Sequence, residues 1–179
     1  MSAAVPPARD DGAPGPTRDE VDRIIEAWAH ERPDLDVAPL SVLSRVSRLS
    51  RHLDLARRAA FARHGLEPWE FDVLSALRRA GAPYRMSPGA LLTQTLVTSG
   101  TMTNRIDRLA ARDLVRRLPS PDDRRGVIVA LTDDGRTRVD AAISTLLEVE
   151  RSLLAALDTT DRAHLADLLR TLVAPFDTP

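Results

Sequence analysis

The chain has 179 residues, enough for one domain with its own hydrophobic core, and its 25 basic and 26 acidic residues leave a net charge of -1. It contains no cysteine, which excludes disulfides, thiolate metal sites and cysteine nucleophiles. No apolar run approaches the roughly 20 residues that span a bilayer, and the amino-terminal residues lack the basic and apolar segments of a signal peptide. We therefore expect a cytoplasmic protein with no membrane partner.

Two helices are predicted in the first third of the chain. Residues 1–16 carry four prolines and few large apolar side chains, which predicts a disordered tail. A capping box of Thr17 and Glu20 predicts a short amphipathic helix after this tail. From Leu40 onward, apolar residues recur at helical spacing until Gly65, which predicts a second, long helix.

Two further helices are predicted to begin at prolines. Pro68 suits the first turn of a third helix that ends before Gly81, and Ser87 with Pro88 repeats the pattern for a short fourth helix. Trp69, next to the first of these prolines, is expected to serve packing.

A fifth helix, capped by Thr98 or Ser99, is predicted to have two different faces. Met102, Ile106 and Leu109 recur at the spacing of one apolar face, and polar side chains occupy the opposite face. After Asp113 the pattern becomes extended.

Two strand-like runs, 114–118 and 127–132, follow the fifth helix. They are separated by a loop of proline, aspartate and glycine that is suited to a hairpin. Thr132 is predicted to cap another long helix, and a final helix is predicted after Thr159. The expected fold is mainly α with a small β-hairpin wing, a winged helix-turn-helix with amino- and carboxyl-terminal helical dimerisation regions.

The same pattern predicts how the chain is organised. We expect residues 17–179 to form a single domain in which 66–132 bind DNA, whereas 17–65 and 133–175 supply dimerisation and ligand binding. Extended apolar stripes on the terminal helices would be exposed to solvent in an isolated subunit and would favour aggregation. They therefore favour a homodimer.

Double-stranded DNA is the partner that this element order predicts. A helix fits the major groove, and arginines on a hairpin reach phosphates or the minor groove. The segment from Thr98 to Gly126 contains seven arginines and four aspartates, so it is net positive, although the whole chain is slightly acidic. Arg124 and Arg125 are the candidates for DNA contacts from the hairpin. The candidates on the helix are Ser99, Thr101, Thr103, Asn104, Arg105 and Arg108. An ordinary solvated helix face is the alternative interpretation of these arginines.

The segment TSGTMTNRIDRLAARDLVRRLPSPDDRRGVIVALTDDGR resembles the winged-helix core of the MarR family of bacterial regulators, and the resemblance covers nearly all of residues 37–175. It implies a homodimeric repressor that binds a pseudopalindromic operator and is released by a small ligand. The turn after the recognition helix usually holds glycine in this family, whereas this chain has Asp113. Aspartate tolerates the left-handed conformation better than most residues, so we expect the same fold.

A narrower resemblance concerns the ligand. The added amino-terminal helix with Trp28, FDVL around Asp72 and NRIDRL around Arg105 are similar to the urate-responsive, PecS/TamR-like branch of the family. This resemblance implies that Trp28, Asp72, Arg105 and Arg117 sense a small anion such as urate or a tricarboxylate-like metabolite. Guanidinium groups bind such oxygens bidentately. From the residues alone, Trp28 suits either a ligand wall or the core, and Asp72 either a site or plain surface.

Other classes of function find little support in the sequence. The chain has no catalytic motif, so we expect no enzyme and no cofactor. No two of its four histidines are spaced as i and i+4, so we expect no metal site. Two alternatives remain open: a winged helix that binds another protein, and a regulator that responds to no ligand.

Overall fold

The computed structural model describes residues 18–95, 98–120 and 126–176, which fall into two compact units that divide between Leu53 and Asp54. The described residues form a mainly helical fold with one small sheet, as predicted. The tail predicted over 1–16 and the hairpin candidates Arg124 and Arg125 lie outside the described residues.

The first unit contains α1 (Glu20–Glu31) and the first part of α2 (Leu40–Ala62). The cap of α1 is Asp19, whose carboxylate accepts hydrogen bonds from the backbone N–H groups of Val21 and Asp22. The capping box predicted for Thr17 and Glu20 is therefore wrong. Asp19 lies immediately before the first helical residue, where a carboxylate can satisfy two unpaired donors at the positive end of the helix.

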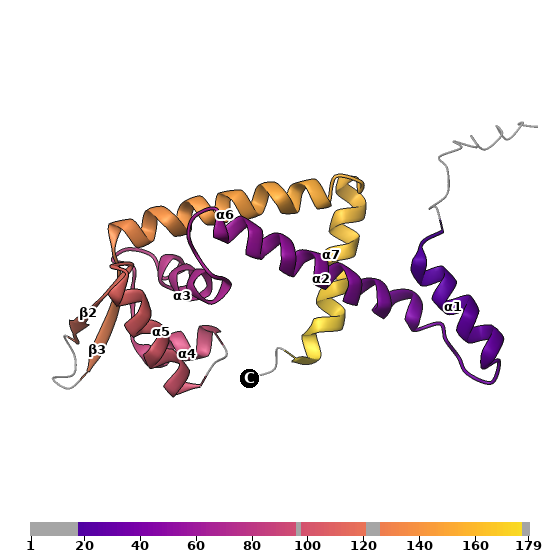
Figure 1. Ribbon diagram of the computed structural model, residues 1–179, viewed down its shortest axis with the longest axis horizontal. Helices are drawn as coiled ribbons and strands as arrows, with labels where there is room; N and C mark the ends of the chain where they lie inside the picture. Colours follow the sequence, from indigo (N-terminus) through magenta and orange to yellow (C-terminus); the bar gives the residue numbers. More distant parts are fainter. Residues whose placement is uncertain (1–17, 96–97, 121–125, 177–179) are drawn as a thin grey trace, which may run out of the picture. The chain divides into compact units, whose positions relative to one another are not determined.

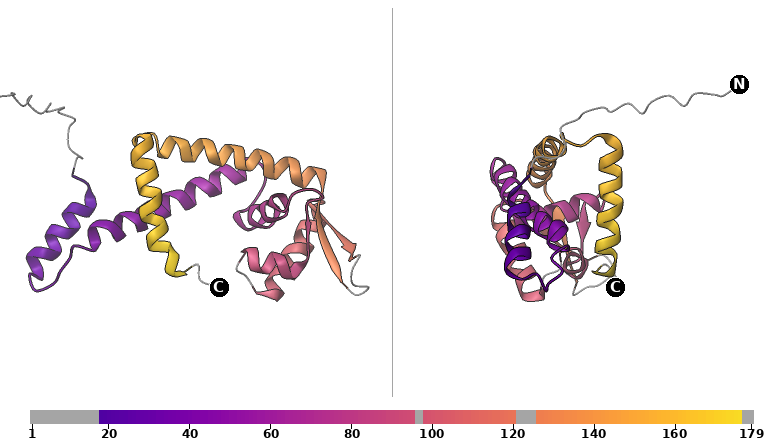
Figure 2. Two further views of the ribbon diagram at one scale, coloured as in Figure 1. Left: turned by 180° about the vertical axis from the view of Figure 1, so that it is seen from behind. Right: turned by 90° about the vertical axis from the view of Figure 1, so that its right-hand side faces the viewer.

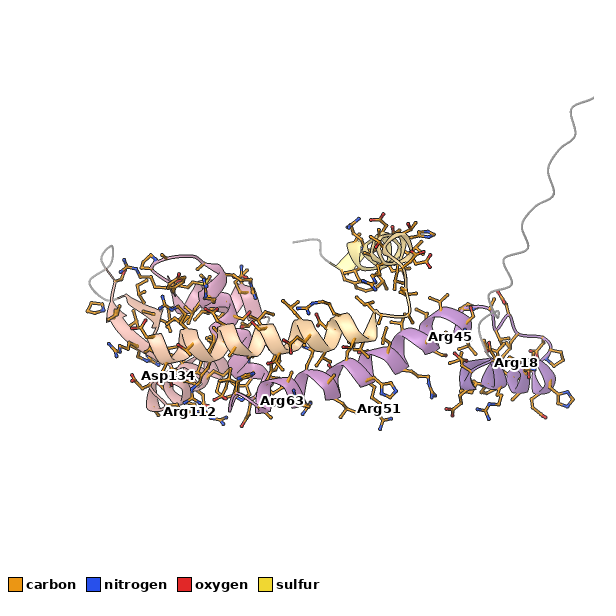
Figure 3. All side chains as sticks on the ribbon, turned by 90° about the horizontal axis from the view of Figure 1, so that it is seen from above. Arg18, Arg45, Arg51, Arg63, Arg112 and Asp134 are labelled. Carbon is orange, nitrogen blue, oxygen red and sulfur yellow. The ribbon has the colours of Figure 1, made fainter. Side chains whose placement is uncertain are left out.

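An ion-pair cluster joins α1 to α2 within this unit. Arg45 of α2 binds both Asp19 and Asp22, at 2.9 and 2.7 Å. The hydrogen bond from Arg45 lowers the pKa of Asp19 to about 2. Figure 3 labels Arg45 on α2 and Arg18 at the start of α1.

The second unit contains the rest of α2 and the remaining elements. Figure 1 shows three shorter helices gathered at one end of the long helix α6 (Asp133–Leu153). These helices are α3 (Pro68–Arg79), α4 (Pro88–Thr95) and α5 (Ser99–Ala111). The last helix, α7 (Thr159–Val173), follows the far end of α6 without lying along it, and it continues into a short 3-10 turn (Figure 2).

The sheet has three antiparallel strands in the order β1-β3-β2. β2 (Val115–Pro119) and β3 (Val127–Leu131) form the predicted hairpin. β1 (Arg85–Met86) pairs with the other edge of β3. A strand of two residues is too short to show an alternating pattern in the sequence, which is why β1 was not predicted.

The hydrophobic core lies where α3, α5, the sheet and the start of α6 meet the end of α2. The rings of Phe61 and Phe71 stack there with their centroids 4.0 Å apart. Met102, Ile106 and Leu109 are each buried, so the predicted apolar face of α5 is confirmed. The opposite face of α5 is left for other contacts.

The junction of α5, β2 and α6 explains two features of the sequence. Asp113 has a φ of 54°, the left-handed conformation that was expected of it. Thr132 caps α6 by accepting from the N–H of Gly135 and donates to the carbonyl of Asp113 at 2.7 Å. A Cβ at Gly135 would lie 2.1 Å from the carbonyl oxygen of Leu114, so this position admits no side chain.

The terminal helix α7 contributes nothing to this core. None of its 15 residues is buried. Large apolar side chains remain exposed on α7 and on the end of α6: Leu147, Leu153, Leu154, Leu168, Leu169, Leu172 and Val173. Within the described ranges, no helix has an apolar stretch of the length and composition needed to cross a membrane.

Candidate nucleic-acid interface and anion cavity

The polar side of α5 is the first candidate site. Ser99, Thr101, Thr103, Asn104 and Arg108 are exposed there, and Arg105 is half-buried. The hydroxyl of Thr103 donates to the carbonyl of Ser99, which fixes its rotamer against the helix. These six predicted residues therefore come from one helix whose opposite side is anchored in the core.

Part of this surface surrounds an open hollow of about 450 Å³. Its α5 residues, which we call the outer face, are Gly100, Thr101, Asn104, Arg105 and Arg108. Trp69 of α3 completes the lining. The indole is half-buried and packs against the core, as the sequence predicted. Its ring also lies against the outer face, a contact that the sequence did not predict. It depends on how α3 packs near α5, which no spacing in the sequence reports.

Other arginines of this stretch are held by protein partners. Arg112 binds Glu70, a carboxylate that is only 2% exposed, and also donates to the carbonyl of Gly65 at 2.6 Å. Arg117 binds Asp107 at 2.5 Å. Arg105 and Arg108 are the two arginines of this segment that lie on the outer face of α5.

The second candidate site is a cavity of about 280 Å³ beside Asp72. Its lining combines two guanidinium groups with hydroxyl and amide groups and one aromatic ring: Arg57, Phe71, Asp72, Ser75, Arg79, Gln94 and Thr95. Arg79 hydrogen-bonds the hydroxyl of Ser75, which orients its guanidinium along α3. Two cations that converge with polar groups suit a small anion.

Asp72 is the acidic member of this cavity. Its side chain keeps contact with solvent, but nearby protein atoms displace part of its water, and this desolvation raises the pKa of Asp72 above the ordinary 3.8. The charges of Arg57, Arg105 and Arg79 act in the opposite direction. Arg105 does not line this cavity, but its charge reaches Asp72 from the outer face of α5.

Of the four residues predicted to sense the ligand, the structure places Asp72 in this cavity, and Arg105 lies near enough for its charge to act on the pKa of Asp72. Arg117 is not among the described residues that line the Asp72 cavity. Trp28 belongs to the other unit, where it is 49% exposed and lines a separate open apolar hollow with Ile24. Arg57 and Arg79 line the cavity as well, and the sequence did not single them out because isolated arginines on two helices form no motif.

The described ranges contain no group of three or more histidine, aspartate or glutamate side chains that could hold a metal ion.

The element order defines the class of protein. A short helix, a helix with a polar and cationic outer face, and a two-stranded hairpin make a winged helix-turn-helix, a DNA-binding fold. A family model described as MarR family matches residues 64–126, a segment that contains both helices and the first strand of the hairpin and ends just before β3.

Known relatives match far more of the chain. The HTH-type transcriptional regulator PecS of Dickeya dadantii is 39% identical over 150 residues, which cover 84% of this chain and 90% of PecS. The HTH-type transcriptional repressor NicR of Pseudomonas putida is 32% identical over 143 residues, which cover 78% of this chain and 89% of NicR. The chain belongs to the MarR family of transcriptional regulators. This membership confirms the predicted family and the prediction that the protein is not an enzyme.

A solved structure agrees with this assignment. The structure of BpsR from Bordetella bronchiseptica, described by its regulation of DNA binding by 6-hydroxynicotinic acid, is 30% identical to this chain. It superposes with a TM-score of 0.55 and covers 72% of this chain and 98% of BpsR.

Proposed function

We propose that the protein is a homodimeric repressor that reads a pseudopalindromic DNA site with α5 of each subunit and releases it when a small anion binds beside Asp72. The outer face of α5 is the observation that carries this proposal. Two cationic side chains, an amide and a hydroxyl project there from a helix that the core holds rigidly.

The residue types on the outer face match the chemistry of base edges. An arginine donates two hydrogen bonds to guanine, and an asparagine pairs with adenine in the same bidentate manner. Arg105, Arg108 and Asn104 are the residues that we assign to such contacts. Ser99, Thr101 and Thr103 are assigned to phosphates or base edges nearby, and Arg124 and Arg125 to the DNA backbone.

The exposed apolar residues of α7 and the end of α6 support the homodimer. Leu168 and Leu172 lie four residues apart on α7, so they share one side of the helix, and both are about half exposed. A second copy that covers this side would bury it and would hold two α5 helices at a fixed separation. Half-sites roughly 10 base pairs apart are then expected.

The cavity beside Asp72 supports a small anionic ligand. The bound anion would take the guanidiniums of Arg57 and Arg79 in place of the carboxylate of Asp72, and Phe71 would face a flat ring. An adjoining hollow of about 200 Å³ shares Phe71 and Arg79 and adds the apolar side chains of Val139 and Ile143. Urate, tricarboxylates and 6-hydroxynicotinate, the ligand named for BpsR, are the compounds to test.

Arg105 offers the path from this cavity to DNA. Its guanidinium interacts electrostatically with Asp72 and lies on the outer face of α5. An anion that displaces Asp72 would draw Arg105 toward the cavity and away from the major groove. Trp28 is retained as a candidate ligand wall, and Arg117 as a candidate that would reach the ligand through a rearrangement at Asp107.

DNA recognition is tested by selecting binding sites from a randomised duplex library. We expect a twofold-symmetric sequence, with an affinity that falls with salt at a logarithmic slope of about -5 or steeper. Asn104→Ala should relax the preference at particular base pairs, whereas Arg124→Ala with Arg125→Ala should weaken binding to all sequences alike. Selection that enriches no sequence, together with affinity that is flat in salt, would reject the proposal.

Ligand release is tested by titrating urate, citrate and 6-hydroxynicotinate against the complex with the selected duplex. Arg79→Met should abolish the response, and Arg63→Met, at an exposed arginine that does not line the cavity, should leave it intact. Affinity for the anion should rise as the pH falls toward the raised pKa of Asp72, because protonation removes a competing negative charge. Asp72→Asn should remove this pH dependence.

A further inference from the structure

Trp69 lies on α3, yet its indole ring faces the outer face of α5. The guanidinium carbon of Arg108 lies 4.7 Å from the ring centroid, and that of Arg105 lies 5.6 Å from it. Both distances are within the roughly 6 Å over which a cation is attracted to an aromatic ring. One indole therefore engages two arginines that lie three residues apart on the same side of α5.

The edge of this ring is held as well. The indole N–H donates to Oε2 of Glu67 at 2.5 Å, and Oε1 of the same carboxylate lies 3.8 Å from Nη2 of Arg108. The backbone N–H of Glu67 in turn donates to the buried Glu70 at 2.9 Å. Glu67 thus fixes the tilt of the ring and offsets part of the charge that the two arginines bring together.

Two guanidiniums on one side of a helix would otherwise repel each other and sample many rotamers. DNA binding would then have to order both side chains, which opposes association. The ring attracts both cations, and its own position is fixed by the first turn of α3. The arginines are therefore held close together before any DNA arrives.

We propose that Trp69 is a positioning residue for DNA recognition, whose ring holds Arg105 and Arg108 side by side so that both enter the major groove already ordered. This role rests on the DNA binding by α5 proposed above. Because base-edge contacts specify sequence whereas phosphate contacts do not, the loss of the ring should affect the selected site more than other DNA.

The matched pair Trp69→Phe and Trp69→Leu tests the aromatic face. Leucine is apolar but has no π-system, so Trp69→Leu should weaken binding to the selected duplex about tenfold and to a scrambled duplex less than about twofold. Phenylalanine keeps a ring, so Trp69→Phe should stay within about threefold of the wild type on the selected duplex. Equal affinities of wild type and Trp69→Leu, or equal losses on both duplexes, would overturn the proposal.

A double-variant cycle with Arg108→Ala distinguishes positioning from packing. If the ring acts through this arginine, Trp69→Leu should cost clearly less in the Arg108→Ala protein than in the wild type. Losses that simply add would contradict a positioning role. Failure of the wild type to prefer its selected duplex would count against the proposed function instead, so the two failures are distinguishable.

Fluorescence provides a readout that needs no folded Trp69 variant. The chain has two tryptophans, so Trp28→Phe leaves Trp69 as the sole tryptophan, which can be excited selectively over the one tyrosine. In this background, Arg108→Ala should shift the fluorescence emission of the free protein to longer wavelength, because the indole of Trp69 becomes more exposed to solvent when the arginine side chain is removed. An unchanged spectrum would show that the two side chains do not interact in solution.

Discussion

The region from the end of α2 to α6 and the terminal helix α7 differ sharply in how they use their apolar residues. The first region builds one continuous core, from Ala60 to Leu146, although the end of α6 leaves Leu147 and Leu153 exposed. α7 leaves Leu168, Leu169 and Leu172 in solvent. A chain that places leucines at helical spacing and then leaves them uncovered has a surface suited to another protein.

This difference separates two kinds of stability. The core region holds α5 in place through contacts within one chain, so its stability should not depend on protein concentration. If a second copy covers α7, as proposed above, the stability of this helix should depend on protein concentration. DNA recognition by two α5 helices needs both.

The largest effect is expected from Leu168→Asp combined with Leu172→Asp. Each buried leucine contributes about 1.5–3 kcal/mol, and a homodimer would contain four of these side chains, so the dimer should dissociate at micromolar concentration. Sedimentation velocity should then find a monomer whose far-UV circular dichroism retains the helical signal of the core. As a control, Leu118→Asp replaces a partly exposed leucine of β2 and should leave the dimer intact. A double variant that remains dimeric would remove the proposed role of α7.

The next effect concerns the core region alone. Gly135→Ala places a Cβ 2.1 Å from a backbone oxygen, so α6 or the α5–β2 turn must shift, at a cost of about 3 kcal/mol. In a protein of this size, thermal unfolding should then occur roughly 6–12 °C lower. Gly89→Ala is the matched control, since its Cβ would meet only a hydroxyl at 3.9 Å. Equal melting temperatures for the two variants would show that the close approach is not tight in solution.

A smaller loss is expected at the ion pair between Arg112 and Glu70, which ties the end of α5 to α3. Arg112→Met would leave the buried carboxylate unpaired, and because Arg112 is itself partly exposed we expect a cost of about 2 kcal/mol in the free energy of unfolding. Adding Glu70→Gln removes the buried charge and should restore most of the loss. Urea denaturation measures both variants. If the double variant is no more stable than Arg112→Met, charge pairing is not what stabilises this contact.

The smallest effect belongs to α1. The folded pKa of Asp19, about 2, lies below its ordinary value of 3.8, so its contribution to stability is present above pH 4 and is lost as the pH falls toward 2. Because this carboxylate is exposed, the loss should be modest. Nuclear magnetic resonance titration of the Asp19 carboxyl should give a midpoint near 2, and Arg45→Met should move it back toward 3.8. A normal midpoint in the wild type would contradict the ion pair.

Much of this organisation could be predicted from the sequence because periodic patterns report local structure. The apolar spacing in α5 predicted its buried face, Thr132 was predicted as a helix cap, and the left-handed turn at Asp113 was expected from the family resemblance. The contact between Trp69 and α5 could not be predicted, nor could the cavity residues Arg57 and Arg79. These features depend on how separate helices pack, which a single sequence does not encode in any short spacing.

The mass of the protein bound to its selected duplex tests the central claim most directly. Native mass spectrometry at nanomolar protein should find two chains on each duplex, because two copies of α5 must occupy two half-sites together. A complex of one chain per duplex that binds with undiminished affinity would contradict the account.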